Sequence, residues 1–403
     1  MTPNPHAPTP MSPALVVLVL SMLLGLQPIT TDLYLPALPG LKQDLGATMA
    51  QTQLTLTALL LAFGASQLVW GPVSDRFGRR PVLLVGMTAY LLASVACALV
   101  STMEQLIVWR TLQGIAMGAG VMCARAIVRD LYEPAQGATV MSKGLSGLGV
   151  LACLSAPLGG LLTWLWNWHA ALSALAVFGA LTLGVIAWRF EETVPQKNPL
   201  ALQWSTLVRT WLHILRNPEF VAFSVLSLCS YGALFTFLAA SSFVFIKVLG
   251  FGTTEYGLTM LLNSFVYLLG TFVCRRLVRQ RGVRRTVALA AFASLFCGLV
   301  MPALALAGIQ AGWAIMLPMC AFTFAHGIHQ PCGQSGAVGP FPQAAGAASA
   351  LNGFLMMVAA FFTGQWLGGH MDGTVFPLAW GMCFWCVLLA LSAWTLVQRY
   401  GKT

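Results

Sequence analysis

The sequence has little charge. Aspartate, glutamate, lysine and arginine make up 8% of its 403 residues, against about 25% in an ordinary soluble domain. So few charges cannot cover the surface of a soluble protein of this size. A hydrophobic content of 58% and a mean hydropathy of +0.79 suit a chain that is solvated by lipid. The composition therefore excludes a soluble globular domain and predicts a membrane protein.

Motifs for nucleotide hydrolysis, metal binding and catalysis are also missing. No G-x-x-x-x-G-K-[ST] motif occurs, so a proton gradient is the expected energy source and no cofactor is expected. His326 and His329 lie three residues apart, but no other metal-ligand residues lie near them in the sequence. The sequence predicts neither a metal site nor catalytic residues. Because the net charge of +10 comes without a soluble basic module, nucleic acid is not an expected partner.

Long apolar runs, in contrast, are abundant. A bilayer-spanning helix needs about 20 apolar residues. Hydropathy places such runs near residues 13–36, 49–70, 81–101, 104–126, 138–162, 169–189, 219–246, 254–274, 286–308, 311–333, 345–368 and 375–397. We expect an all-α polytopic membrane protein with twelve transmembrane helices in two six-helix halves. Residues 1–190 form the N-terminal half, 191–218 a cytoplasmic linker rich in charge and proline, and 219–403 the C-terminal half.

The basic residues lie almost entirely on one side of this topology. Of the 21 lysine and arginine residues, all except Lys42, Lys247 and Arg110 fall in or beside segments on the side of the two termini. Cytoplasmic loops carry such an excess of lysine and arginine. The distribution predicts that both termini are cytoplasmic.

The loop after the second apolar run carries the most specific motif. It reads Gly71-Pro-Val-Ser-Asp75-Arg76-Phe-Gly78-Arg79-Arg80. Gly71 allows close helix approach, Gly78 a tight turn, and Asp75 can pair with arginine. The pattern resembles the G-x-x-x-D-R-x-G-R-R signature of the major facilitator superfamily, and the resemblance implies a loop that holds the transporter in alternative conformations. The alternative is that Arg76, Arg79 and Arg80 only set the topology.

Three further stretches resemble the Bcr/CflA branch of drug:proton antiporters within that superfamily. They are Asp32-Leu-Tyr-Leu-Pro-Ala-Leu-Pro39, Arg129-Asp130-Leu-Tyr132 and Ala156-Pro157-Leu-Gly159-Gly160. The resemblance implies a multi-pass protein of the bacterial inner membrane, and we expect a monomer that exchanges small molecules for protons.

The antiporter-type helix that carries Ala156, Pro157 and Gly160 departs from the family pattern. The family usually has glycine before the proline and two glycines after a two-residue gap. Here Ala156 precedes Pro157, Gly159 comes one residue early and Leu161 fills the second late position. This departure leaves the substrate and the direction of transport open.

Two charged residues are candidates for proton coupling. Asp32 is the one acid of the first half that lies well inside an apolar run, and Arg110 is the one base placed inside a span. A carboxyl group that moves between water and apolar surroundings can bind and release a proton. In the resembled family an arginine at the position of Arg110 is linked to proton coupling. The alternatives are that Asp32 caps the helix break that Pro36 begins, and that Arg110 extends to the outer surface.

Polar and aromatic residues inside the apolar spans are candidates for the substrate cavity. In the resembled family the first, fourth, seventh and tenth spans line that cavity. Ordinary packing is the alternative for each candidate. The candidates are Gln113, Tyr231, Phe235, His326 and Asn352.

Three functions are weighed on this basis. The first is a proton-coupled antiporter that exports drugs or other small amphiphilic molecules. The second is a proton-coupled transporter of one metabolite, such as a nucleoside or a sugar, on the same fold. The third, a membrane receptor or enzyme, would require a clustered catalytic set that the sequence does not contain. The first function agrees best with the motifs.

Overall fold

The computed structural model describes residues 11–132, 134–194 and 197–401. Residues 1–10 and Lys402, which contribute to the predicted orientation of the termini, lie outside these ranges. The N-terminal half contains α1 (Pro13–Asp32), η1 (Leu35–Ala37), α2 (Leu38–Asp44), α3 (Met49–Phe77), α4 (Arg79–Leu99), α5 (Met103–Leu131), α6 (Pro134–Leu165) and α7 (Trp168–Arg189). The rest of the chain contains α8 (Trp204–Leu215), α9 (Pro218–Phe243), η2 (Val244–Val248), α10 (Thr253–Leu306), α11 (Gly312–Val338), η3 (Pro342–Ala344), α12 (Ala345–His370), α13 (Phe376–Trp394) and α14 (Leu396–Tyr400).

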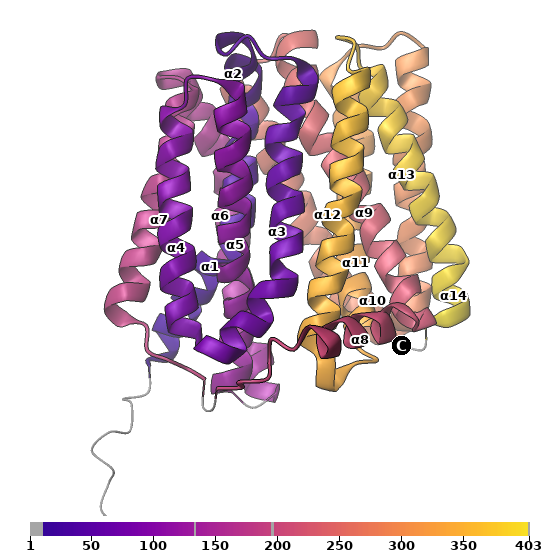
Figure 1. Cartoon of the computed structure of the whole chain (residues 1–403). Helices are drawn as coiled ribbons and strands as arrows, with labels where there is room; N and C mark the ends of the chain where they lie inside the picture. The colour runs from indigo at the N-terminus through magenta and orange to yellow at the C-terminus, as the bar shows by residue number, and fades with distance from the viewer. Residues whose placement is uncertain (1–10, 133, 195–196, 402–403) are drawn as a thin grey trace, which may run out of the picture.

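The long helices stand side by side in a bundle, with the N-terminal half and the C-terminal half next to each other (Figure 1). Ten helical segments of the described chain are long and apolar enough to cross a membrane. One of them, α10, has non-helical backbone at Gly282 (φ 73°, ψ 169°), so it comprises two membrane-length helices. The 27-residue α11 is also long enough to cross, at about 1.5 Å per residue. The prediction of an all-α protein with twelve transmembrane helices is confirmed.

The two halves meet along two helix pairs, α3 with α12 and α6 with α10. Glycine allows the close approach at both. A Cβ atom on Gly64 of α3 would lie 2.7 Å from Met357 of α12, and one on Gly160 of α6 would lie 2.5 Å from the carbonyl oxygen of Thr253 of α10. Backbones that approach this closely are typical of helix packing in membranes, where small residues replace the hydrophobic driving force.

In the described part of the segment predicted as a linker, residues 191–194 and 197–218, the helix α8 precedes the start of α9. The 12-residue α8 lies across the end of the bundle, at the end where the C-terminus also lies (Figure 1). The Asn217 side chain accepts hydrogen bonds from the backbone N–H groups of Glu219 and Phe220, so α9 begins directly after α8.

Candidate functional site

The predicted switch loop forms an ion network around Arg79, whose side chain is almost fully buried. Its guanidinium donates to the carboxylates of Asp75 (2.6 Å) and Asp130 (2.9 Å) and to the hydroxyl of Ser74 (2.6 Å). Asp75 also pairs with Arg129 at 3.4 Å. Because buried charge-assisted bonds fix geometry as well as charge, this network holds the ends of α3, α4 and α5 together.

Glu192 closes the same network from the segment after α7. Its carboxylate accepts hydrogen bonds from the backbone N–H groups of Arg79 (2.8 Å) and Arg80 (3.2 Å), the first residues of α4. A carboxylate at a helix N-terminus satisfies free N–H groups and interacts favourably with the helix dipole. Gly78 has φ 107°, and a Cβ atom there would lie 2.3 Å from the Glu192 carboxylate. Glycine is therefore required at position 78 for two separate reasons.

The other residues of the motif lie around this network. A Cβ atom on Gly71 would lie 3.4 Å from Met122 of α5, so the glycine permits ordinary contact rather than unusually close packing. The guanidinium of Arg76 lies over the Phe77 ring at 5.5 Å, and that of Arg80 donates to the carbonyl oxygen of Ala187 at 3.2 Å. The motif residues thus differ in role: Arg79 is central, and Arg76 and Arg80 are peripheral.

Arg110 is fully buried in the N-terminal half. Its guanidinium donates to the side chain of Gln113 (2.9 Å) and to the carbonyl oxygen of Thr30 (3.2 Å), and it lies 4.3 Å from the centroid of the Tyr34 ring. Gln113 in turn donates to Ser94 at 2.7 Å. Arg110 does not extend to the outer surface, and it fixes the last turn of α1 against α5 and α4.

Asp32 is the last residue of α1 and is partly buried. Its carboxylate accepts a hydrogen bond from the Thr31 hydroxyl at 2.8 Å and lies close enough to Tyr231 and Tyr256 of the C-terminal half for electrostatic interaction with both. Neither η1 nor α2, the two helices that follow, receives a side-chain cap. Asp32 therefore does not cap either helix, and its electrostatic partners Tyr231 and Tyr256 place it near the junction between the halves.

Asp32 and Arg110 form no ion pair in the described chain, but the last turn of α1 connects them. Arg110 binds the carbonyl oxygen of Thr30, and the hydroxyl of the next residue, Thr31, donates to Asp32. A movement of α5 relative to α1 would therefore shift the Asp32 carboxylate through the contacts of Thr30 and Thr31. The coupling of these two residues to protons stays a prediction.

The antiporter-type helix α6 lies against α10 of the other half. A Cβ atom on Gly257 would lie 2.9 Å from the Cα atom of Pro157 and 3.1 Å from the carbonyl oxygen of Ala156. The hydroxyl of Thr253 donates to the carbonyl oxygen of Gly160 at 3.2 Å. Pro157 leaves the helix bonding pattern interrupted at this contact, so Ala156, Pro157 and Gly160 form part of the interface between the halves.

The substrate-cavity candidates are buried, and most already have partners. Gln113 is bound by Arg110 and Ser94, and the His326 ring forms a 2.8 Å hydrogen bond with Ser230. Tyr231 and Phe235 lie on α9, and Tyr231 is near Asp32. Asn352 donates to the sulfur of Met356, but its side-chain oxygen is buried without a partner. Tyr231 and Asn352 are therefore the candidates with unused polar capacity toward a ligand.

Sequence reasoning missed Arg125. Arg125 lies in the last two turns of α5, where the sequence indicated only a basic residue at the end of a span, and it is partly buried. Its guanidinium donates to the hydroxyl of Ser349 of α12 at 2.6 Å and so joins the two halves. The Arg125-Ala-Ile-Val-Arg129-Asp130 stretch is a sequence signal for such residues, because its charges recur at helical spacing.

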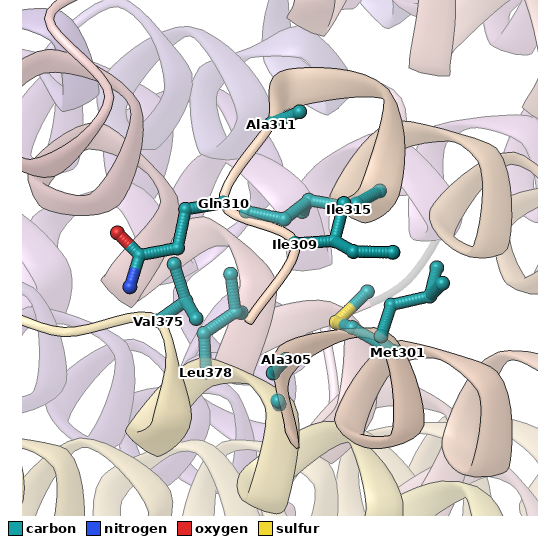
Figure 2. A pocket seen from close by; sticks show the side chains of 11 residues that line it. Met301, Ala305, Ile309, Gln310, Ala311, Ile315, Val375 and Leu378 are labelled. Atoms are coloured by element: carbon teal, nitrogen blue, oxygen red, sulfur yellow. The ribbon is translucent and has the colours of Figure 1, made fainter. Parts of the chain in front are cut away.

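A crevice at the end of α10 is too small to hold a transported molecule. Figure 2 shows it between the end of α10, the start of α11 and the start of α13, with Met301, Ile309, Ile315 and Leu378 among its lining residues. Its volume of about 10 Å³ corresponds to about one water molecule. The charged and polar residues between the halves remain the candidate site.

Two packed halves of membrane-length helices, with buried charged groups inside the N-terminal half and partly buried ones at the junction, are the architecture of a membrane transporter. The family model of the Major Facilitator Superfamily matches residues 20–364, and the chain belongs to this superfamily. Multidrug resistance protein D of Escherichia coli K12 is 30% identical over 86% of each chain. The bicyclomycin resistance protein homolog of Haemophilus influenzae is 26% identical over 96% of this chain and 97% of its own length. The resemblance to Bcr/CflA-type proteins is thereby confirmed.

The fold has the same support from solved structures. The D-xylose–proton symporter superposes with a TM-score of 0.75 at 18% identity and covers 97% of this chain and 99% of its own. At this identity the likeness shows the fold alone. The protein is thus a multi-pass membrane transporter of small molecules, with the fold of its superfamily.

Proposed function

We propose that the protein is a proton-coupled antiporter that exports drugs or other small amphiphilic molecules. The observation that carries the proposal is Asp32: a carboxylate without a basic partner in the described chain, near the junction of the halves and within electrostatic range of Tyr231 and Tyr256. A carboxylate in this place can exchange a proton as the halves move. The relatives named for multidrug and bicyclomycin resistance support drugs as the substrate class.

A proton supplies enough free energy for this task. One proton entering down 100 mV gives about 2.3 kcal/mol, and one pH unit adds about 1.4 kcal/mol. With one-to-one coupling, their sum would hold a neutral solute at roughly a 500-fold gradient. Neither a cofactor nor a catalytic residue is part of the proposal.

The proposed setting is the bacterial inner membrane, with the protein acting as a monomer and both termini in the cytoplasm. The distribution of lysine and arginine supports this orientation. Reporter fusions after Asn198 and at Gly282 are expected to report the cytoplasm, and a fusion at Gly373 the exterior. An exterior report after Asn198 would contradict the orientation.

The function is tested in cells with and without the protein, in one experiment with two readouts. We expect raised resistance to several structurally different drugs and no change in the uptake of radiolabelled nucleosides and sugars. The Asp32→Asn variant, which is expected to lose proton-driven export, is expressed at the same level and controls for indirect effects of membrane-protein expression. Unchanged drug susceptibility together with altered uptake of one metabolite would favour the single-metabolite transporter instead.

The switch loop gives a further prediction. Asp75→Asn removes the negative charge that pairs with Arg79 and Arg129 while it preserves the shape of the side chain. We expect drug transport to fall at least about tenfold at near-normal expression, because the network that stabilises one arrangement of the helix ends is weakened. Glu104→Gln, which changes an exposed acid at the start of α5, is the matched control. Wild-type transport by Asp75→Asn would reduce the motif to a topology signal.

A further inference from the structure

The helix α8 has three distinct faces. Leu207, Trp211 and Ile214 share one face, and Ile214 is fully buried against the rest of the protein. At 100° per residue, Trp204, Val208, Leu212 and Leu215 fall on a neighbouring arc, where they are 60%, 44%, 48% and 39% exposed. Arg209 and Arg216 lie just beyond this arc. An apolar arc beside arginine is typical of a helix that lies in a membrane surface.

The position of α8 agrees with a location at the membrane surface. The helix ends at Leu215, and the span formed by α9 begins three residues later at Pro218. Figure 1 shows α8 lying across the ends of the long helices rather than along them. The aromatic ring of His213 packs edge-on against Phe341, at 6.0 Å, in the connection between α11 and α12. These contacts hold α8 at the level where the spans end.

A groove runs along the exposed side of α8. The residues that line it are Ser205, Val208, Arg209, Leu212, His213 and Arg216. The groove is shallow and lies on one face of this single helix, where the apolar Val208 and Leu212 lie beside the guanidinium groups of Arg209 and Arg216. Within the described chain neither Arg209 nor Arg216 forms an ion pair, and no acid occurs in the sequence between Glu192 and Glu219. Among the described residues, the groove thus has two guanidinium groups that form no ion pair.

We propose that this groove binds an anionic phospholipid. The two guanidinium groups bind the phosphate, and the acyl chains lie along the apolar arc of Trp204, Val208 and Leu212. Arginine suits a phosphate because its planar fork makes paired, charge-assisted hydrogen bonds. Apolar and cationic side chains side by side on one helix face match the two parts of a phospholipid, whereas a free anion would use only the cationic ones. This inference does not depend on which substrate is transported.

The test measures lipid binding to the full-length protein in detergent. Native mass spectrometry follows titration with dioleoylphosphatidylglycerol and, separately, with dioleoylphosphatidylcholine, which has the same acyl chains and no net charge. The wild type is expected to retain phosphatidylglycerol at least about tenfold more tightly than phosphatidylcholine. Equal affinity for the two lipids would overturn the proposal.

Paired variants separate the site from the overall charge. Arg209→Gln/Arg216→Gln is expected to weaken phosphatidylglycerol binding about tenfold or more, at roughly fivefold per arginine near a membrane surface. The control, Arg276→Gln/Arg279→Gln, removes two exposed arginines of α10 and is expected to change binding less than twofold. Both variants are compared with the wild type in size-exclusion profile and melting temperature. Equal losses in the two variants would show non-specific attraction and overturn the proposal.

A last arm distinguishes a lipid from a free anion. Inorganic phosphate at 10-fold molar excess over the lipid is expected to leave phosphatidylglycerol bound. The Val208→Ser/Leu212→Ser variant is expected to weaken the binding of dioleoylphosphatidylglycerol more than the binding of its short-chain dihexanoyl form. Displacement by inorganic phosphate, or an equal effect of the serine variant on both chain lengths, would identify an anion site without an acyl-chain groove and contradict the proposal.

Discussion

Asp32→Asn is expected to abolish proton-driven accumulation of substrate while it preserves binding and downhill exchange. Asparagine has nearly the same shape as aspartate and can still accept the hydrogen bond from Thr31, but it cannot release a proton at physiological pH. The contacts at the end of α1 should therefore remain, and only the exchange of protons is lost. The size of the effect follows from the coupling: without a proton, the roughly 500-fold gradient that it could maintain falls to none.

The measurement is proton flux upon addition of substrate to proteoliposomes, together with substrate binding to the same preparation. Glu104→Gln serves again as the matched acid-to-amide control, because Glu104 is exposed and lies at a helix start. Normal proton flux in Asp32→Asn would remove Asp32 from the mechanism. Loss of both flux and substrate binding would instead indicate a role in shaping the site.

Arg110→Lys is expected to reduce transport by about a hundredfold. Lysine keeps the positive charge, but its ammonium group lacks the planar fork that binds the Thr30 carbonyl and Gln113 at once while it stacks on Tyr34. The last turn of α1, which ends in Asp32, would lose its connection to α5. Losing a fully buried hydrogen-bonded guanidinium costs on the order of 2–5 kcal/mol in comparable cases.

The readout for Arg110→Lys is initial transport rate at equal expression, with thermal stability measured in parallel. Arg189→Lys is the control, since Arg189 is exposed at the end of α7 and stacks on Trp188. If Arg110→Lys transported at the wild-type rate, charge alone would be sufficient at this position, and the fork geometry would have no role.

The fold followed from the sequence because hydropathy and helix length are local properties. The low charge content and the twelve apolar runs define the number of spans. Both can be read along the chain, without knowing which residues contact one another in the folded protein. The pairing of Asp75 with an arginine of its own motif was also accessible, since Arg79 follows four residues later, across the turn at Gly78 between α3 and α4. Closeness in the sequence therefore made the first contact of the ion network accessible, whereas the turn at Gly78 (φ 107°) that brings the two side chains together is not a helical repeat.

The remaining contacts of the site could not be read from spacing. Asp130 binds Arg79 from a different helix, and Arg125 binds Ser349 from a different half. Both contacts join residues far apart in the chain, and their partners are chosen by how the helices pack. The same holds for Asp32, whose neighbours Tyr231 and Tyr256 belong to α9 and α10. Such partners depend on tertiary packing rather than on local sequence.

The contacts between the halves have an energetic consequence. The Gln53 amide donates to the carbonyl oxygen of Ala239 at 2.7 Å, Arg125 donates to Ser349, and Thr253 donates to Gly160. A neutral hydrogen bond contributes a net of about 0.5–1.5 kcal/mol, and one with a charged donor about 1.5–3 kcal/mol. These three bonds together thus stabilise the observed arrangement by roughly 2.5–6 kcal/mol, a range that includes the 3.7 kcal/mol or so that one proton provides. An interface of a few exchangeable bonds keeps two arrangements close enough in free energy for a single protonation event to reverse their populations.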